Sequence, residues 1–226
     1  MDESSENCKC CGHRHANVDE TRKAIMFAAL EEFALRSVDG ARTREIAKKA
    51  NVNHAAINYH FGSKEEMYRR IIEESVAHFE EAYAPLISEV GEFLKTDGKN
   101  SAHAISLIKK ILIFHHSFFY LPDFSKFFLL FKREELFPSL GFETIFKKTC
   151  KPFYENFLKL VEVASKFKYS KKQSSMIVIA LMNLNGGLTA SRVPFLKMNK
   201  QDAITQKDID IFCDITSLAI DKIFAD

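Results

Sequence analysis

The sequence predicts an all-α protein with a small helical unit at its N-terminus and a larger helical bundle after it. Two observations favour this class. From Asp19 onward the apolar residues recur at helical spacing, and several segments between breaks are longer than about 20 residues, which is too long for strands. The 226 residues also contain only 8 Gly and 5 Pro, which is few for the tight turns of an all-β chain.

The composition narrows the function classes. The formal net charge is +2, from 32 Lys and Arg against 30 Asp and Glu, and 46% of the residues are hydrophobic, as in an ordinary soluble domain. No apolar run reaches the roughly 18–20 residues that span a bilayer, and the acidic, Cys-rich N-terminus is no secretory signal, so we expect a cytoplasmic protein that binds no membrane. Motifs typical of enzymes, such as a P-loop or H-E-x-x-H, do not occur, so we expect no catalytic activity.

The first predicted helix begins near Asn17, which forms a capping box with Glu20, and it ends where residues 37–42 include Asp-Gly. One face of this helix is apolar at the spacing i, i+3, i+4 and i+8, which predicts that it is buried. The residues of that face are Ile25, Ala28, Ala29 and Phe33. Residues 1–17 are polar and rich in Cys and His, and we interpret them as a flexible tail.

Two short helices are predicted next, at 44–50 and 54–60. Asn51 lies in the turn between them, where Asn tolerates the left-handed conformation. Asn53 is a favoured N-cap for the second of these helices.

A further capping box, Ser63 with Glu66, starts a long helix that we expect to reach about Ala84, where Pro85 kinks or ends it. Beyond Pro85, breaks separate a series of apolar segments of helical character. These segments lie at about 102–120, 124–136, 140–167, 170–192 and 205–225.

The layout of the first three helices, with about three residues between the second and the third, is typical of a helix-turn-helix DNA-binding unit, whose third helix enters the major groove. The local charge agrees, because residues 41–64 contain one acid, Glu45, against five basic residues whose charges suit phosphates. The basic residues are Arg42, Arg44, Lys48, Lys49 and Lys64. A plain solvated basic surface has the same charge pattern.

The third helix offers groups for both bases and phosphates. Asn58 can pair with adenine, His54 can reach a base or a phosphate, and the small Ala55 permits close approach to base edges. The groups that suit phosphate oxygens are Tyr59, His60 and Lys64.

The amino-acid sequence of this stretch, TREIAKKANVN at 43–53 and AINYHFGSKEEMY at 56–68, resembles that of the TetR/AcrR family of bacterial transcriptional regulators, most of all its CecR-type subgroup. The resemblance covers about residues 20–75. It implies an all-α homodimer, a palindromic operator and a C-terminal ligand pocket whose occupation releases DNA. It also implies a set of DNA-contacting residues: Thr43, Arg44, Asn53, His54, Ala55, Asn58, Tyr59, His60 and Lys64.

Two residues depart from the family pattern. Asn51 stands where the family usually has Gly, which is a mild change because Asn tolerates the same conformation. Arg42 stands where the family usually has Ser or Thr, so the capping box with Glu45 is weakened while Arg42 adds a phosphate contact. The resemblance further implies that Phe61 is a core residue.

By the same resemblance, segments 170–192 and 205–225 form an intersubunit four-helix bundle. Each carries an apolar stripe, although an ordinary core within one chain would use the same stripes. The stripes are Ile177, Ala180, Leu181, Leu184 and Leu188 in the first segment, and Ile211, Ile215, Leu218 and Ile223 in the second.

The middle of the chain is rich in aromatic residues and is the predicted ligand region. Large rings around a few polar groups suit a small apolar or aromatic effector, although Phe at helical spacing also fills an ordinary core. The candidate ligand-binding residues are His115, His116, Phe119, Tyr120, Phe127, Phe131, Phe153, Phe157 and Asn183.

The tail contains a cluster of soft metal ligands, because thiolate and imidazole bind zinc or copper. Its members are Cys8, Cys10, Cys11, His13 and His15. A metal- or thiol-responsive arm is therefore an alternative, but the tail has no C-x-x-C pair and we expect no required cofactor. Cys150 and Cys213 lie in apolar helical contexts and are expected to be free thiols.

These patterns together predict a tail at 1–17, a helix-turn-helix DNA-binding domain at 18–65 and a ligand-binding and dimerisation domain at 66–226. We expect a transcriptional repressor that binds a palindromic double-stranded DNA operator as a homodimer and is released by a small hydrophobic or aromatic effector. A helical partner-binding module is the other alternative.

Overall fold

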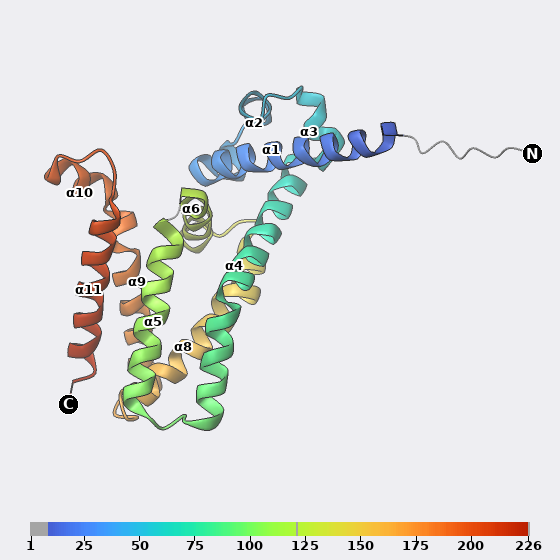
Figure 1. Ribbon diagram of the computed structural model, residues 1–226. Helices are drawn as coiled ribbons and strands as arrows, with labels where there is room; N and C mark the ends of the chain where they lie inside the picture. The colour runs from blue at the N-terminus through green and yellow to red at the C-terminus, as the bar shows by residue number, and fades with distance from the viewer. Residues whose placement is uncertain (1–8, 121, 226) are drawn as a thin grey trace, which may run out of the picture. The chain divides into compact units, whose positions relative to one another are not determined.

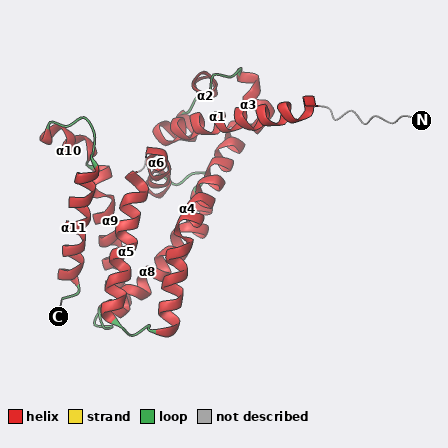
Figure 2. Ribbon diagram, viewed as in Figure 1, coloured by secondary structure: helices red, strands yellow, loops and turns green. Residues whose placement is uncertain are grey.

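The structure, a computed structural model, describes the backbone of residues 9–120 and 122–225, and the side chains of that range except 9–18, 117–124, 185 and 189. The described residues form helices and no strand, which confirms the predicted fold class (Figures 1 and 2). The helices are α1 Lys9–Gly40, α2 Thr43–Lys49, α3 His54–Phe61, α4 Lys64–Thr96, α5 Ser101–Tyr120, α6 Pro122–Leu136, α7 Phe142–Ile145, a π-helix Phe146–Cys150, α8 Lys151–Ala164, α9 Lys171–Ala190, α10 Arg192–Asn199 and α11 Gln206–Ile223.

The chain packs as two compact units. The first unit comprises the residues up to Ser75 together with Lys126–Thr144, and the second comprises Val76–Ser125 together with the residues from Ile145 onward. Packing therefore does not follow a single boundary along the chain, because the segment 126–144 belongs with the N-terminal helices. The functional division at 17 and 65 stays a prediction.

The apolar face predicted for α1 is the core of the first unit. Its four predicted residues are all buried, and Phe33 packs edge-on against Tyr68 of α4 with ring centroids 4.9 Å apart. The predicted break appears at Ser37, which has non-helical angles within α1. The predicted start of the helix at Asn17 is wrong, since α1 begins at Lys9 and no proline interrupts the residues between.

A buried carboxylate joins α4 to the segment after α6 in the first unit. Glu134, which is 1% exposed, accepts hydrogen bonds from the hydroxyls of Tyr68 and Ser139, and its second oxygen accepts the Ser139 backbone N–H at 2.9 Å. Burial, and then the contact with Glu134, raise the pKa of Tyr68 well above its ordinary value, so this hydroxyl keeps its proton and donates. Three donors thus compensate the burial of one carboxylate.

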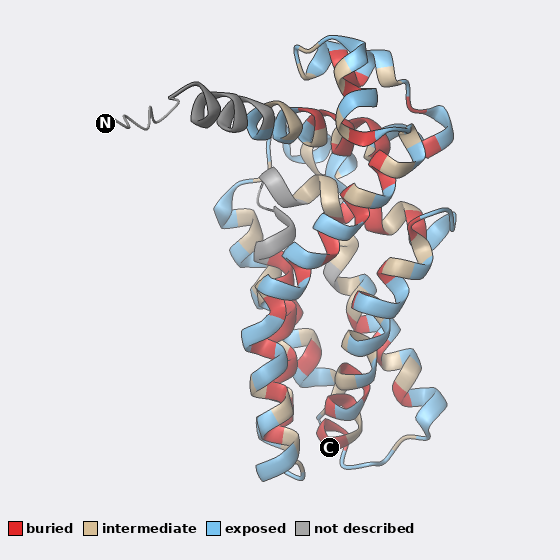
Figure 3. Ribbon diagram, turned by 90° about the vertical axis from the view of Figure 1, so that its right-hand side faces the viewer, coloured by how far each residue is buried: buried red, intermediate tan, exposed pale blue. Residues whose placement is uncertain are grey.

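Helix α4 contributes to both units, its first residues to the first and the rest to the second. Pro85 does not end the helix, as one of the two predicted outcomes had it, because α4 continues to Thr96. The buried residues of α4 recur at alternating steps of four and three on both sides of the proline. Figure 3 shows buried and exposed positions alternating along the helices. The residues of this apolar face of α4 are Ile72, Val76, Phe79, Tyr83, Leu86, Val90 and Phe93. Packing along it offsets the backbone hydrogen bond that Pro85 removes.

The second unit has one hydrophobic core formed by α5, α8, α9, α11 and the C-terminal part of α4. Its fully buried members include Leu112 of α5, Val161 of α8, Leu181 of α9 and Ile220 of α11. Helix α11 starts with a complete capping box between Thr205 and Asp208.

Two predicted segments differ in detail. The segment 140–167 is helical from Phe142 to Ala164, but a π-helical turn at 146–150 precedes Pro152, whose ring nitrogen has no hydrogen to donate within an α-helix. The break predicted at 194–203 begins only after Asn199, where α10 ends. Pro194 lies in the first turn of α10, where the backbone N–H that proline lacks would have no partner within the helix.

Gly141 is a point where the first unit has no room for a side chain. A Cβ atom there would lie 2.8 Å from two side-chain atoms of the buried Ile72 and 3.2 Å from the carboxyl carbon of Glu134. We expect Gly141→Ala to lower the free energy of unfolding by about 1–3 kcal/mol, as overpacking does, when measured by urea denaturation.

Gly91 of α4 is the matched control, because a Cβ atom there would meet nothing within 4 Å. Gly91→Ala should raise the free energy of unfolding by up to about 1 kcal/mol. Equal effects of the two substitutions would contradict the packing at Gly141.

Candidate functional site

The turn between α2 and α3 has the geometry expected from its two asparagines. Asn51 takes the left-handed conformation, with φ 54°. The side chain of Asn53 accepts a hydrogen bond from the Ala55 N–H at 3.0 Å and so caps α3. Gly62, with φ 76°, ends α3 and needs the conformational freedom of glycine. These local contacts set where α3 begins and ends.

Helix α3 has one buried and one exposed face. Ile57 and Phe61, one turn apart, are buried at 1% and 2% exposure, which confirms Phe61 as a core residue. Tyr59 is 80% exposed. The exposed face carries the residues predicted to read bases, namely His54, Ala55 and Asn58, next to Tyr59. The buried pair therefore holds α3 so that its polar face is open to solvent.

Contacts between elements position three of the predicted DNA-contacting side chains. The Thr43 hydroxyl of α2 lies 2.8 Å from His54 Nε2 of α3, and the Lys64 ammonium donates to the Asp39 carbonyl at 3.4 Å. His60 stacks edge-on against Tyr59, with ring centroids 5.1 Å apart. Thr43 thus links α2 to α3, and Lys64 links the start of α4 to the C-terminal end of α1.

The basic charge counted in the sequence is partly neutralised. Lys49 forms ion pairs with Glu32 at 3.3 Å and Glu31 at 3.7 Å, both on α1. Arg42, Arg44 and Lys48 remain exposed. Arg42 precedes α2 without a side-chain cap, as expected from its departure from the family pattern.

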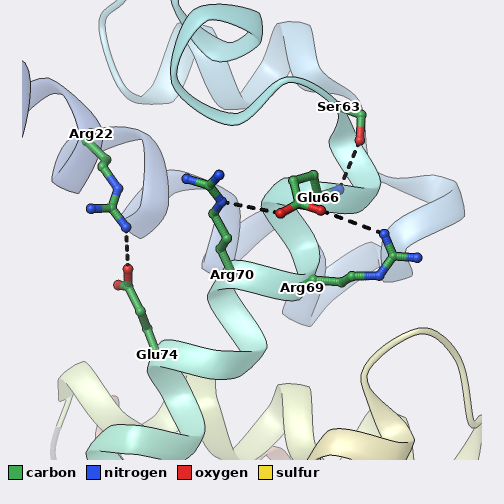
Figure 4. Close-up of polar contacts among 6 residues, drawn as sticks. All are labelled: Arg22, Ser63, Glu66, Arg69, Arg70 and Glu74. Atoms are coloured by element: carbon green, nitrogen blue, oxygen red, sulfur yellow. Dashed lines mark hydrogen bonds and ion pairs between the residues drawn. The ribbon is translucent and has the colours of Figure 1, made fainter.

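The start of α4 is held by contacts that the sequence indicated only in part (Figure 4). Ser63 accepts the Glu66 N–H at 3.0 Å, which is half of the predicted capping box. The Glu66 carboxylate turns instead to Arg70 at 3.5 Å and Arg69 at 3.9 Å, while Arg22 of α1 pairs with Glu74 at 2.8 Å.

The predicted ligand region contains a buried aromatic cluster in the second unit. Tyr83 stacks on Phe79 with centroids 4.0 Å apart, and its hydroxyl lies 2.5 Å from His115 Nδ1. Burial raises the pKa of Tyr83 well above its ordinary value, so the hydroxyl keeps its proton. Which of the two groups donates in the hydrogen bond depends on the tautomer of His115. Phe153 packs edge-on against Tyr83 at 5.7 Å and stacks with Phe157 at 5.8 Å.

Tyr83 is a member of this cluster that the sequence analysis missed, although its place four residues after Phe79 in an apolar pattern was a usable signal. The space beside the cluster, lined by Tyr83, Phe153 and Phe157 among others, measures only about 10 Å³, which is about one water molecule.

The other candidate ligand residues lie elsewhere. His116, beside His115 in sequence, contacts α11 through Phe212, with ring centroids 4.7 Å apart, and lies 3.4 Å from the Thr216 hydroxyl. Phe127 and Phe131 belong to the first unit, whereas Asn183 is exposed and donates to the Ile179 carbonyl of its own helix. The side chains of Phe119 and Tyr120 lie outside the described residues. The ligand set as a whole stays a prediction.

The predicted metal ligands Cys8, Cys10, Cys11, His13 and His15 also lie outside the described side chains. Among the side chains that the structure does describe, no group of three or more His, Cys, Asp or Glu is placed to hold a metal ion. Cys150 and Cys213 are both half-buried, and neither forms a disulfide with a described residue. None of the described helices is long and apolar enough to cross a membrane.

Residues 25–71 match the family of bacterial regulatory proteins called the tetR family. The chain is similar to the transcriptional repressor NicS of Pseudomonas putida, with 36% identity over 33% of this chain and 35% of the relative. It is also similar to the transcriptional dual regulator CecR of Shigella flexneri, with 25% identity over 63% of this chain and 64% of the relative. The matches thus span about a third to under two thirds of these relatives.

Solved structures agree on the fold. A TetR-like transcriptional regulator from Rhodococcus sp. RHA1 superposes with a TM-score of 0.63 at 18% identity, over 91% of this chain and 97% of that one. A TerR/AcrR-family regulator from Aquifex aeolicus VF5 gives 0.51 at 19% identity, over 90% and 99%. The matched segment and relatives confirm the resemblance to the TetR/AcrR family, and the relatives named here are transcriptional regulators.

His116 makes the stability of the second unit sensitive to acid. Its burial lowers its pKa from the ordinary 6.5 to about 4. Between these two pH values the unfolded chain binds a proton that the folded chain does not, so stability is lost as the pH falls. We expect His116 to account for a loss of up to about 3 kcal/mol in the unfolding free energy of wild type over this pH range. His116→Gln should remove that part of the loss in urea denaturation at the two pH values.

The exposed Asn183 of α9 provides the control, Asn183→Gln, which exchanges one neutral side chain for another and should keep the wild-type dependence on pH. A His116→Gln protein that loses as much stability in acid as wild type would contradict the assignment.

Proposed function

We propose that this chain, TetR-like in its N-terminal sequence and in its fold, is a DNA-binding transcriptional regulator that acts as a homodimer in the bacterial cytoplasm. The observation that carries the proposal is helix α3, whose buried Ile57 and Phe61 leave a polar face with the highly exposed Tyr59 open to solvent. A helix with such a face, held after a short turn, is what major-groove readout needs.

The residues of this face divide by chemistry. Asn58 and His54 suit base edges, with Ala55 leaving room for close approach. Tyr59, His60 and Lys64 suit phosphate oxygens, as do Thr43, Arg42 and Arg44 near the start of α2. Since Lys49 is paired with α1, the affinity for phosphate rests on the remaining cations.

Exposed apolar faces on α9 and α11 support the homodimer. In α11, Ile211, Ile215 and Leu218 follow the spacing i, i+4 and i+7 and are 48%, 51% and 65% exposed. In α9, Ile179 is 47% exposed. Each of these faces costs free energy in water, and a second copy of the chain can cover them through a two-fold symmetric four-helix contact.

The aromatic cluster around Tyr83 and His115 supports a small hydrophobic or aromatic effector. Its rings supply apolar contact, and the Tyr83–His115 pair supplies a polar group that a ligand can engage. Because the space there is only about 10 Å³, an effector has to displace rings such as the half-buried Phe153. A ligand that binds only the displaced arrangement shifts the population of the dimer away from its DNA-binding form.

Regulation by repression is the form we propose. The names of the matched relatives include a repressor and a dual regulator.

Fluorescence anisotropy with double-stranded DNA from upstream of the gene, at two salt concentrations, tests DNA binding. Wild type should bind with a steep dependence on salt. Tyr59→Ala should weaken binding by about 1–3 kcal/mol, and Lys64→Ala should weaken it while lowering the salt slope by about 1, because one phosphate contact is lost.

Lys95→Ala is the matched control, because Lys95 is exposed in the last turn of the same helix as Lys64. An equal loss of DNA affinity in Lys95→Ala and Lys64→Ala would show that binding depends on the total charge of the protein and not on the position of Lys64. Absence of binding to this DNA and to a random-sequence pool, by a folded dimer, would contradict the proposal.

The proposed dimer contact is tested by Leu218→Glu, which puts an unpaired carboxylate in an apolar interface. We expect the dimer dissociation constant to rise by about a hundredfold or more, as measured by sedimentation velocity. Leu136→Glu, at a leucine of α6 that is 71% exposed, should leave it unchanged. Dimers of normal strength in Leu218→Glu would show that the chains associate elsewhere.

A further inference from the structure

Two adjoining hollows lie where the loop after α8 and the start of α9 meet the end of α11, within the second unit. The larger measures about 560 Å³ and is lined by Tyr169, Lys172, Met176, Ile177 and Ile223, together with Ser170 and Gln173. The smaller measures about 220 Å³, shares Tyr169 and Ile223 with the larger, and adds Lys166, Lys168 and Phe224. The two hollows adjoin at these shared residues and are together called the groove; the larger has the size of ordinary small-molecule sites, about 300–1,000 Å³.

The floor of this groove is apolar and supported from behind. Ile177, Ile223 and Phe224 are partly buried and pack against the core of the second unit. Met176, at 58% exposure, adds a flexible apolar side chain at the open side. An apolar body placed on this floor therefore removes hydrophobic surface from water.

The rim of the groove is cationic. Lys166, Lys168 and Lys172 line it, and none of the described residues that line either hollow is Asp or Glu. One reason is that residues 163–201 contain seven Lys and Arg and no acid, while Asp226, which follows the lining residue Ala225, lies outside the described residues. The nearby Asp221 of α11 is paired with Lys109 of α5 at 2.6 Å.

We infer that this groove binds a small amphipathic anion, an apolar chain or ring that ends in a carboxylate or a comparable anionic group. The apolar part lies on Ile177, Ile223 and Met176, and the anionic group meets Lys168 and Lys172, with Tyr169 between the two hollows. The charge of the rim complements the anion, and the shape of the floor complements the apolar part. The site differs from the aromatic cluster around Tyr83, and it does not depend on DNA binding by α3.

A dansyl-labelled undecanoate is the probe, because its emission rises when its apolar part leaves water. Wild-type protein should bind it, and unlabelled decanoate should displace it at lower concentration than decanol, which has the same chain without the charge. Binding should weaken with salt, because the rim is exposed.

Three variants locate the site. Met176→Glu puts a like charge beside the ligand, and Lys168→Gln/Lys172→Gln removes two cations, so each should weaken binding of the probe by about fivefold or more. Ile179→Glu is the matched control, since Ile179 is exposed on the same helix but does not line the groove. It should bind the probe as wild type does, even where the proposed dimer contact is weakened.

Normal binding of the probe by Met176→Glu, or equal loss in Met176→Glu and Ile179→Glu, would overturn the inference. Equal competition by decanol and decanoate would overturn the role of the lysines. These measurements contain no DNA. A negative result would therefore overturn the proposed groove without bearing on the proposed DNA-binding function.

Discussion

The apolar face of helix α4 is the constraint on which the rest of the structure depends. Its buried residues alternate at steps of four and three from Ile72 to Phe93, and they supply core to both compact units. Tyr68, just before this face, packs against Phe33 of α1, while Tyr83, within it, packs against Phe114 and Phe153. The same helix begins at Lys64, which belongs to the proposed DNA-contacting surface. Substitutions along this face would therefore affect both units.

Polar groups on or beside α4 are buried at two places, and each is compensated by partners from far along the chain. Tyr68 donates to Glu134, and Tyr83 shares a hydrogen bond with His115. In both cases burial keeps the tyrosine hydroxyl protonated at neutral pH. The Glu134 site also receives Ser139, so losing any one partner would leave a buried carboxylate short of a donor. Such sites favour one arrangement of the helices over similar ones that an apolar core alone would permit.

One exposed face of the first unit and the exposed faces of α9 and α11 in the second differ in chemistry. The first unit presents the polar face of α3 with basic residues beside it, and most of these side chains can donate or accept hydrogen bonds with a nucleic acid. The second unit presents apolar faces on α9 and α11 and a cationic groove at their ends. Protein partners suit the apolar faces, because their burial is driven by the loss of surface from water. A small anion suits the groove, because its rim has charge and its floor does not.

The sequence by itself determined the fold class, the helix-turn-helix and the local turns, because those depend on residues a few positions apart. The left-handed Asn51 and the cap at Asn53 both follow from contacts within a few residues. Only the tertiary structure decided the features that join distant residues. Lys49 is neutralised from α1, Pro85 lies inside a continuous helix, and Glu134 meets a tyrosine 66 positions away. The physical reason is that these outcomes depend on burial and on which partners lie opposite, and neither is encoded in spacing along one segment.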